Sequence, residues 1–183
     1  MASPAARLAP PAELVDFLQA GPPPVFIGFG SMAPSQEERL GELVAADRAG
    51  CARLCRRGAG PIAVGDDVLA IGDLPHDWLF PRTAAVVHHA GAGTTAAGLR
   101  AGVPAVPVPV MADQPFRAAR LHRIGVAPRP LPFHELTADA LAEAITACVA
   151  DPAHRRQAVE LARRIATEDD TAAVLARIDV ASD

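Results

Sequence analysis

The 183-residue chain contains no lysine, no asparagine and no tyrosine, so all 17 of its positively charged residues are arginine. A Walker-type phosphate loop needs its lysine, and a pyridoxal phosphate enzyme needs a lysine for the Schiff base. A protein kinase needs a lysine and also a metal-binding asparagine. The composition therefore excludes these three classes of enzyme.

Cysteine is also scarce. Cys51, Cys55 and Cys148 form an odd set without paired spacing, which is typical of a reducing compartment rather than of a disulfide framework. Cys51 and Cys55 are four residues apart and could share a helix face as metal ligands, but no histidine cluster lies beside them. We therefore interpret the cysteines as small hydrophobic residues of a cytoplasmic protein.

Long apolar runs and an excess of positive charge are missing as well. No stretch reaches the ~18–20 consecutive apolar residues of a membrane span, and the first residues lack the apolar run of a secretory signal. The formal net charge of -4 provides no basic field for nucleic acid or an anionic membrane surface. We expect no membrane span and no nucleic acid partner.

Strand and helix patterns alternate along most of the chain. Short apolar runs predict buried strands, and amphipathic stripes behind them predict helices. The strands are expected at residues 24–30, 68–71, 84–89 and 104–110, and the helices near 35–44, 94–102, 114–124 and 137–149, followed by further arginine-rich helices. The alternation indicates an α/β protein with a doubly wound, Rossmann-like parallel sheet.

The beginning of the chain differs from the rest. Residues 1–23 are rich in proline and contain a short amphipathic turn at Leu14, Phe17 and Leu18. We interpret them as a leader or interdomain linker of extended character. The folded unit is expected to comprise residues 24–183.

Three further segments give local expectations. Residues 50–65 are irregular, although CARLC within them could be a strand. Residues 74–82 are expected to form a loop in which Trp78 is either a core anchor or a solvent-facing contact. The helix at 114–124 is expected to bury Phe116, and the arginines of the last helices are expected to form a solvated face.

Three loops are candidates for a binding site, because ligands in an open α/β sheet bind outside the carboxyl ends of the strands. They are residues 28–31, 88–95 and 111–114. In the second loop, a strand is followed by Gly91, Gly93 and the start of a helix. Glycine lets the backbone approach an anion, and the N–H groups and positive dipole end of the helix hold a phosphate without lysine.

Side chains around these glycines refine the prediction. Thr94 and Thr95 can cap the helix or donate a hydroxyl to a phosphate. His88 and His89 point to opposite faces of the strand, so we interpret His89 as a ligand-facing donor and His88 as a hydrogen-bonded core imidazole. Ala96 stands where the dinucleotide fingerprint has its third glycine, which argues against a Rossmann-type oxidoreductase with a nicotinamide or flavin.

Asp113 and Gln114 follow the last predicted strand. A carboxylate beside a carboxamide offers acceptors and donors that suit vicinal sugar hydroxyls. Alternatively, Asp113 only caps the helix that follows. The local pattern leaves both interpretations open.

The order of several motifs carries a family resemblance. GFGS at 28–31, IGDLPHDWLFPR at 71–82, VVHHAGAGTTAAGLRAGVP at 86–104 and DQPF at 113–116 together resemble the carboxy-terminal half of family 1 glycosyltransferases. Bacterial antibiotic and sterol glycosyltransferases are the most similar in these motifs. The histidine–glycine box followed at this distance by DQP is far more specific than either motif alone.

This resemblance implies one half of the two-domain GT-B fold, in which an acceptor domain precedes a nucleotide-sugar domain. It implies that residues 24–183 form the nucleotide-sugar-binding domain and that the acceptor domain is absent from this chain. Enzymes of this family are inverting and metal-independent, so the resemblance implies a UDP- or dTDP-sugar as co-substrate, with no cofactor and no metal. The acceptor would be a small natural product or a sterol-like molecule.

Nine residues are implied by the resemblance to bind the donor. They are Ser31, His89, Gly91, Gly93 and Thr94 toward the diphosphate, Leu74 toward the base through its backbone, His76 toward the ribose, and Asp113 and Gln114 toward the hydroxyls of the transferred sugar. Plant relatives place a carboxylate for the ribose at the position of Ala97. Bacterial relatives often lack this carboxylate too, so the motifs do not distinguish uridine from thymidine donors.

The resemblance assigns no catalytic residue to this chain, because the family's general base is a histidine of the acceptor domain, paired with an aspartate. Inverting transfer needs that base within reach of the acceptor hydroxyl. We therefore expect the chain alone to bind a nucleotide-sugar without transferring it, or to hydrolyse it slowly. Its expected partners are an acceptor-domain polypeptide or, through the face that would meet the acceptor domain, a second copy of the chain. The alternative is a non-catalytic nucleotide-binding module.

Overall fold

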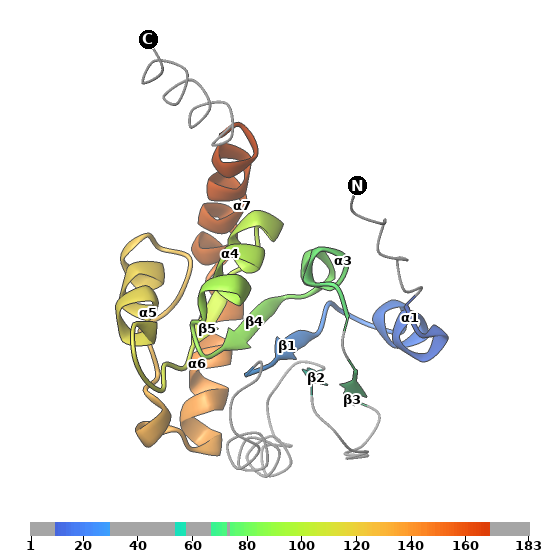
Figure 1. The fold of residues 1–183 in the computed structure, drawn as a ribbon. Helices are drawn as coiled ribbons and strands as arrows, with labels where there is room; N and C mark the ends of the chain where they lie inside the picture. The colour runs from blue at the N-terminus through green and yellow to red at the C-terminus, as the bar shows by residue number, and fades with distance from the viewer. Residues whose placement is uncertain (1–9, 30–53, 58–66, 73, 169–183) are drawn as a thin grey trace, which may run out of the picture.

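The sheet of this protein is parallel throughout. The computed structural model describes residues 10–29, 54–57, 67–72 and 74–168. The strands are β1 (Val25–Ile27), β2 (Leu54–Arg57), β3 (Val68–Ile71), β4 (Ala85–His88) and β5 (Ala105–Pro107). They lie in the order β3-β2-β1-β4-β5 (Figure 1). This order confirms the doubly wound sheet, and the chain reverses direction across the sheet between β1 and β4.

Helices cover both faces of the sheet. They are α1 (Ala12–Gln19), α3 (His76–Leu79), α4 (Ala92–Ala101), α5 (Gln114–Arg123), α6 (Ala138–Ala150) and α7 (Pro152–Ala166), with 3-10 turns η1 (Phe80–Arg82) and η2 (Phe133–Glu135). Figure 1 shows α1, α3 and α4 over one face and α6 over the other. Strand alternation explains this, since Val25 and Ile27 pack with α6 while Phe26, between them, packs with the opposite layer.

Helix α1 extends the folded unit before residue 24. The expected amphipathic turn is a helix of 8 residues, and its Leu14 is 1% exposed in the cluster formed with Phe26 and Ile71. Phe17 and Leu18 are partly buried against the same cluster. Residues that we expected to precede the folded unit therefore pack on it, because three apolar side chains on one helix face gain from burial.

The segment at residues 74–82 is helical rather than a loop. Pro75 occupies the N-cap position of α3. Turn η1 begins at Phe80, and Pro81 is its second residue. Trp78 combines both expected roles: it packs partly buried against the cluster of Phe26, and the guanidinium of Arg82 lies 4.4 Å from its ring centroid. Proline is tolerated at helix starts, where its missing N–H has no intrahelical partner.

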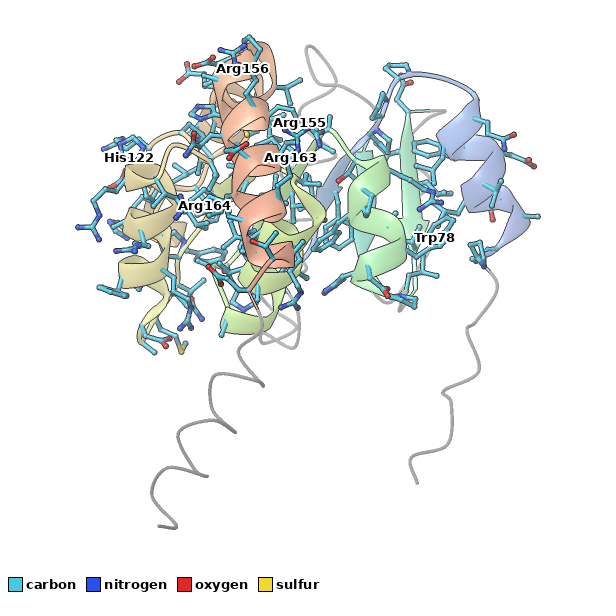
Figure 2. The ribbon with its side chains drawn as sticks, turned by 90° about the horizontal axis from the view of Figure 1, so that it is seen from above. Trp78, His122, Arg155, Arg156, Arg163 and Arg164 are labelled. Carbon is cyan, nitrogen blue, oxygen red and sulfur yellow. The ribbon has the colours of Figure 1, made fainter. Side chains whose placement is uncertain are left out.

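Two helix faces differ from the expectation. On α5, Phe116 is 70% exposed, and the buried positions are Gln114, Ala118 and Leu121. On α7, Arg155 is not part of a solvated face, since its Nη2 donates to the backbone oxygens of Thr83 at 2.6 Å and Ala84 at 3.0 Å. Figure 2 shows Arg155 with Arg156, Arg163 and Arg164 along this helix; the other three are exposed.

Two other expectations concern cysteine and the membrane. Cys148 is buried, and burial raises the pKa of its thiol to about 12, which confirms its role as a small hydrophobic residue. The side chains of Cys51 and Cys55, like the predicted helix at 35–44, lie outside the described residues. No helix within the described ranges is long and apolar enough to cross a membrane.

Candidate functional site

The candidate residues gather at one edge of the sheet. Because all strands are parallel, the turns after β1, β4 and β5 lie at the same edge, next to the point where the strand order reverses. The N–H of Gly28 donates to the oxygen of Val87 at 3.0 Å, and the N–H of Val108 donates to the oxygen of His88 at 2.8 Å. These bonds join the three strand ends. Ser31 lies outside the described residues.

The turn after β4 leads directly into helix α4. Gly91 is the residue before the helix, with φ -64 and ψ 148, and the N–H of Thr95 donates to its oxygen at 2.9 Å. Thr94 and Thr95 therefore lie inside the first turn, and the expectation that they cap the helix is wrong, because the helix starts earlier, at Ala92. The first N–H groups of a helix have no intrahelical acceptor, so this end can hold an anion.

His88 is a core residue. It is 1% exposed, and its Nδ1 accepts the N–H of Ala90 at 3.1 Å. Burial lowers the pKa of His88 to about 3, with a smaller contribution from His89 and His76. The imidazole is therefore neutral at physiological pH, and the interpretation of His88 as a hydrogen-bonded core imidazole is confirmed.

His89 lies in the turn after β4, beside the start of α4. Its ring is half-buried near Phe29, with the ring centroids 6.4 Å apart. The Nδ1 of His89 and the Oγ1 of Thr95 are buried without a hydrogen-bond partner in the described part of the chain. Burial, followed by the charge of Arg117, lowers the pKa of His89, which favours the neutral form of this imidazole. A neutral ring with an unpartnered buried nitrogen is suited to a polar ligand.

Gly91 is required by the position of His89. A Cβ atom at Gly91 would collide with Nε2 of His89, whereas a Cβ at Gly93 would meet nothing within 4 Å. The glycine before α4 therefore provides room for the imidazole, in addition to bringing the backbone close to a ligand.

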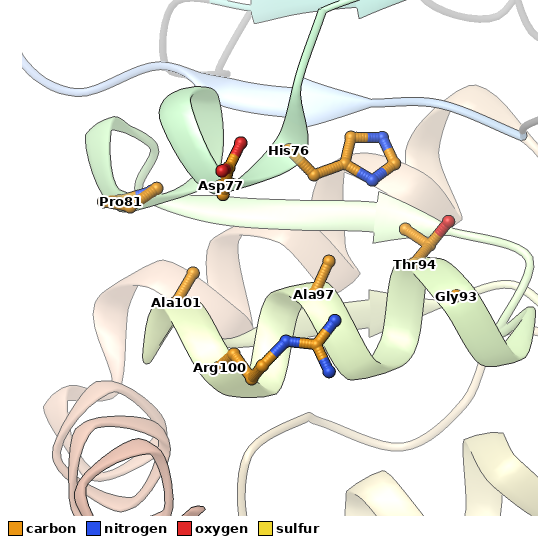
Figure 3. A pocket seen from close by; sticks show the side chains of 8 residues that line it. All are labelled: His76, Asp77, Pro81, Gly93, Thr94, Ala97, Arg100 and Ala101. Atoms are coloured by element: carbon orange, nitrogen blue, oxygen red, sulfur yellow. The ribbon is translucent and has the colours of Figure 1, made fainter. Parts of the chain in front are cut away.

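A cavity of about 710 Å³ lies between α3 and α4. Its lining residues are His76, Asp77, Pro81, Gly93, Thr94, Ala97, Arg100 and Ala101. Figure 3 shows His76 across the cavity from Thr94 and Ala97 of α4. The structure thus brings three of the predicted residues, His76, Gly93 and Thr94, into one cavity. The charged groups Asp77 and Arg100 were not singled out from sequence.

Aromatic contacts fix the orientation of His76. Its ring stacks on Phe80, with the centroids 4.4 Å apart and the planes at 14°, and it meets the ring of Phe26 edge-on at 6.2 Å. Leu74 is partly buried against the same apolar cluster and does not line the cavity.

The turn after β5 is held by Gln114. This residue is 8% exposed, and its Oε1 accepts the N–H groups of Val110 at 2.9 Å and Met111 at 3.1 Å. Asp113 is exposed beside it and makes no side-chain capping bond to α5. Its carboxylate instead pairs with Arg117, whose Nη1 and Nη2 lie 2.5 and 2.6 Å from the two oxygens. The structure therefore does not support the alternative that Asp113 only caps the helix.

Arg117 connects this turn to the turn after β4, because its Nε donates to the oxygen of Ala90 at 2.8 Å. Sequence reasoning did not name Arg117. The available signal was its spacing, since an aspartate and an arginine four residues apart form a pair at the start of a helix.

No group of three or more His, Cys, Asp or Glu side chains in the described ranges is arranged to hold a metal ion. The polar groups of the site are helix N–H groups, imidazoles, hydroxyls, the guanidinium of Arg100 and the carboxylates of Asp77 and Asp113. Such a set matches phosphate and hydroxyl ligands.

Sequence comparisons find relatives of this chain. A family model described as "Erythromycin biosynthesis protein CIII-like, C-terminal domain" matches residues 38–179. The chain is 47% identical over 161 residues to the O-mycaminosyltylonolide 6-deoxyallosyltransferase of Streptomyces fradiae, covering 87% of this chain and 38% of that protein. It is 41% identical over 174 residues to a sterol 3-beta-glucosyltransferase of Arabidopsis thaliana, covering 92% of this chain and 27% of that protein. The chain thus spans less than half the length of these curated relatives.

Two solved structures share the fold. The glycosyltransferase VinC in complex with dTDP matches with a TM-score of 0.70 and 24% identity, covering 89% of this chain and 43% of VinC. Phytolacca americana UGT2, complexed with UDP-2fluoro-glucose and pterostilbene, matches with a TM-score of 0.73 and 23% identity, covering 93% of this chain and 44% of that one. These likenesses confirm the expected fold, one half of a GT-B glycosyltransferase.

Proposed function

The chain belongs to the family of erythromycin biosynthesis protein CIII-like C-terminal domains, and from this premise we propose that it is the donor-binding half of an inverting, metal-independent glycosyltransferase. The enzyme would transfer a hexose from a UDP- or dTDP-sugar to a small natural-product or sterol-like acceptor. The observation that carries the proposal is the turn after β4, where a neutral His89 with an unpartnered buried nitrogen stands beside the start of helix α4.

The diphosphate would lie at the start of α4. The helix N–H groups there supply positive potential, His89 supplies a ring N–H, and Thr94 supplies a hydroxyl. In the proposed reaction these groups stabilise the negative charge that develops on the departing diphosphate. We propose that they take the place of a metal ion.

The nucleoside would occupy the cavity between α3 and α4. His76, held by its stack on Phe80, faces this cavity and would contact the ribose. The resemblance implies that Leu74 meets the base through its backbone; because Leu74 does not line this cavity, the base would extend beyond the cavity to reach it. Arg100 in the same cavity adds donors that suit the carbonyl oxygens of a pyrimidine.

The transferred sugar would be held at the turn after β5. The Asp113 carboxylate is exposed, and its pair with Arg117 leaves acceptor sites for hydroxyl groups. Gln114 would act beside it and, with its Oε1 bonded to Val110 and Met111, keeps the turn in shape. Transfer itself would need a general base against the acceptor, which we propose is a histidine of the amino-terminal acceptor domain.

Calorimetric titration of the purified chain tests this proposal. The ligands are UDP, dTDP, UDP-glucose and dTDP-glucose, each with Mg²⁺ and with a chelator. We expect at least one nucleotide pair to bind equally well in both conditions, and the sugar to increase affinity about tenfold, the effect of one or two hydrogen bonds.

The variant Asp113→Ala separates the two parts of the donor. It is expected to lose the sugar-dependent increase while keeping the affinity for the diphosphate. Glu143→Ala, an exposed carboxylate on α6, is the matched control and should change neither value. The absence of binding to all four nucleotides would contradict the proposed function, and binding that requires the metal would contradict metal independence.

A further inference from the structure

The guanidinium of Arg117 donates hydrogen bonds in two directions. It lies in the first turn of α5, with 26% of its side chain exposed. Its Nε donates to the oxygen of Ala90, 27 positions earlier in the chain, and its two Nη groups reach the carboxylate of Asp113. One planar guanidinium therefore joins the turn after β4 to the turn after β5. Arginine suits this role because its donors are arranged as a rigid fork.

The residue at the first of these contacts has an unusual backbone. Ala90 is fully buried and has a φ of 62, a conformation that L side chains rarely adopt. Its N–H donates to Nδ1 of His88, and its oxygen accepts from Nε of Arg117. Both backbone polar groups of Ala90 are thus bonded to side chains. This alanine stands between His89 and Gly91, where we propose that the diphosphate binds.

The second contact sets the direction of the Asp113 carboxylate. Asp113 is 64% exposed and makes no cap bond to α5, so its two bonds from Arg117 are what orient it. A carboxylate has about four lone-pair sites, and the two that Arg117 leaves open can accept hydrogen bonds from other donors. The position of Arg117 therefore determines where hydroxyl groups can bind.

Resting on the proposed function, we infer that Arg117 is a positioning residue that sets the spacing between the diphosphate-binding turn and the sugar-binding carboxylate. The rigid fork of its guanidinium fixes the distance between the start of α4 and the Asp113 carboxylate. A nucleotide-sugar whose diphosphate lies at α4 therefore places its sugar beside Asp113. Arg117 itself touches the donor at neither end. Its effect is on the sugar-dependent part of the affinity.

A purely structural role for Arg117 makes a different prediction. If the guanidinium only fastens α5 to the sheet, its loss lowers the melting temperature and leaves the relative affinities of the diphosphate and the nucleotide-sugar unchanged. The ratio of the two dissociation constants is therefore the deciding quantity, and it is insensitive to the fraction of folded protein.

The test uses Arg117→Lys and Arg117→Met in the full chain, with UDP, UDP-glucose, dTDP and dTDP-glucose as probes. Lysine keeps the charge but not the fork. We expect Arg117→Lys to bind the diphosphates within about twofold of wild type and to lose most of the roughly tenfold gain from the sugar. If Arg117→Met does not fold, the lysine variant carries the test. Arg120→Lys, on the same helix and exposed, is the control.

A double variant adds a second readout. Asp113→Ala should reduce the sugar-dependent gain in wild type but have no further effect in the Arg117→Lys background, because both changes remove the same oriented carboxylate. Additive effects of the two substitutions, or an unchanged ratio in Arg117→Lys, would overturn the inference and leave the proposed function intact. A wild-type chain that binds none of the four nucleotides would overturn the proposed function and this inference together.

Discussion

In the turn after β4, the buried imidazole of His88 accepts the N–H of Ala90, whereas in the turn after β5 the buried carboxamide of Gln114 accepts two N–H groups. Each turn contains an alanine in the left-handed region, Ala90 with a φ of 62 and Ala112 with a φ of 53. In each turn, the residue next to the buried side chain is more exposed to solvent: His89 beside His88, and Asp113 beside Gln114. Two turns of similar construction would thus serve the two ends of the donor in the proposed function.

The chemistry of the two turns differs. The first turn combines imidazoles whose pKa is lowered by burial with helix N–H groups, and the second presents a carboxylate held by an arginine. An imidazole gains a proton within the accessible pH range, whereas an amide does not. The comparison therefore predicts that acid weakens the first turn and spares the hydrogen bonds of Gln114 in the second.

The largest expected effect is on the pH dependence of the free energy of unfolding, and it comes from replacing His88. In the folded protein the pKa of His88 is about 3, below its value of about 6.5 when unfolded. Its contribution to stability is therefore present above pH 6.5 and is lost as the pH falls toward 3. Between pH 7.5 and pH 4.5, His88→Gln should lose about 3 kcal/mol less free energy of unfolding than wild type. Urea unfolding at both pH values measures this, and equal losses would refute the prediction.

An intermediate effect is expected at Gln114. The substitution Gln114→Met keeps the size of the side chain but removes the acceptor of two backbone N–H groups. It should lower the free energy of unfolding by about 1–3 kcal/mol, by the same amount at pH 7.5 and at pH 4.5. Gln157→Met, at an exposed position of α7, is the control and should stay within about 0.5 kcal/mol of wild type. A strong pH dependence of the Gln114 effect would show that the two turns do not differ as described.

The smallest effect concerns the first turn alone. Gly91→Ala places a methyl group against His89 and should lower the free energy of unfolding by about 1 kcal/mol, because the imidazole must move. Gly93→Ala, in the first turn of α4 with open space around it, should raise it by up to about 1 kcal/mol through helix propensity. Thermal unfolding of the two variants measures whether stability falls in Gly91→Ala and rises in Gly93→Ala. In a His89→Ala background the penalty at Gly91 should disappear; a penalty that persists would argue against the described packing.

Strands β1, β3, β4 and β5 were predictable because each lies in a short apolar run between turn residues. The expected strand at 68–71 coincides with β3, and that at 84–89 contains β4. Strand β2 (Leu54–Arg57) overlaps only the end of CARLC, since its arginines hide the pattern. The helix α3 was missed: residues 74–82 were expected to form a loop, whereas Pro75 and Pro81 both stand at helix starts.

Tertiary contacts explain what the sequence did not reveal. Periodicity assigned Phe116 to the core, but α5 instead buries Gln114, whose carboxamide is needed by the backbone of the preceding turn. At the site, the loops and their residues could be named from the order of strands, glycines and helices. Arg117 could not, because its role depends on a contact with Ala90, which no local pattern predicts.

Both ends of helix α4 are closely packed against neighbouring parts of the chain. At its start Gly91 admits the ring of His89, and at its end Gly102, with a φ of 67, lies so close to α7 that a Cβ atom would be 3.3 Å from Cα of Val159. Both contacts oppose a shift of the helix along its axis. The N–H groups at its start are positioned when the chain folds, so a diphosphate bound there as proposed would meet donors in fixed places, and discrimination between ligands would rest on their fit rather than on adaptation of the helix.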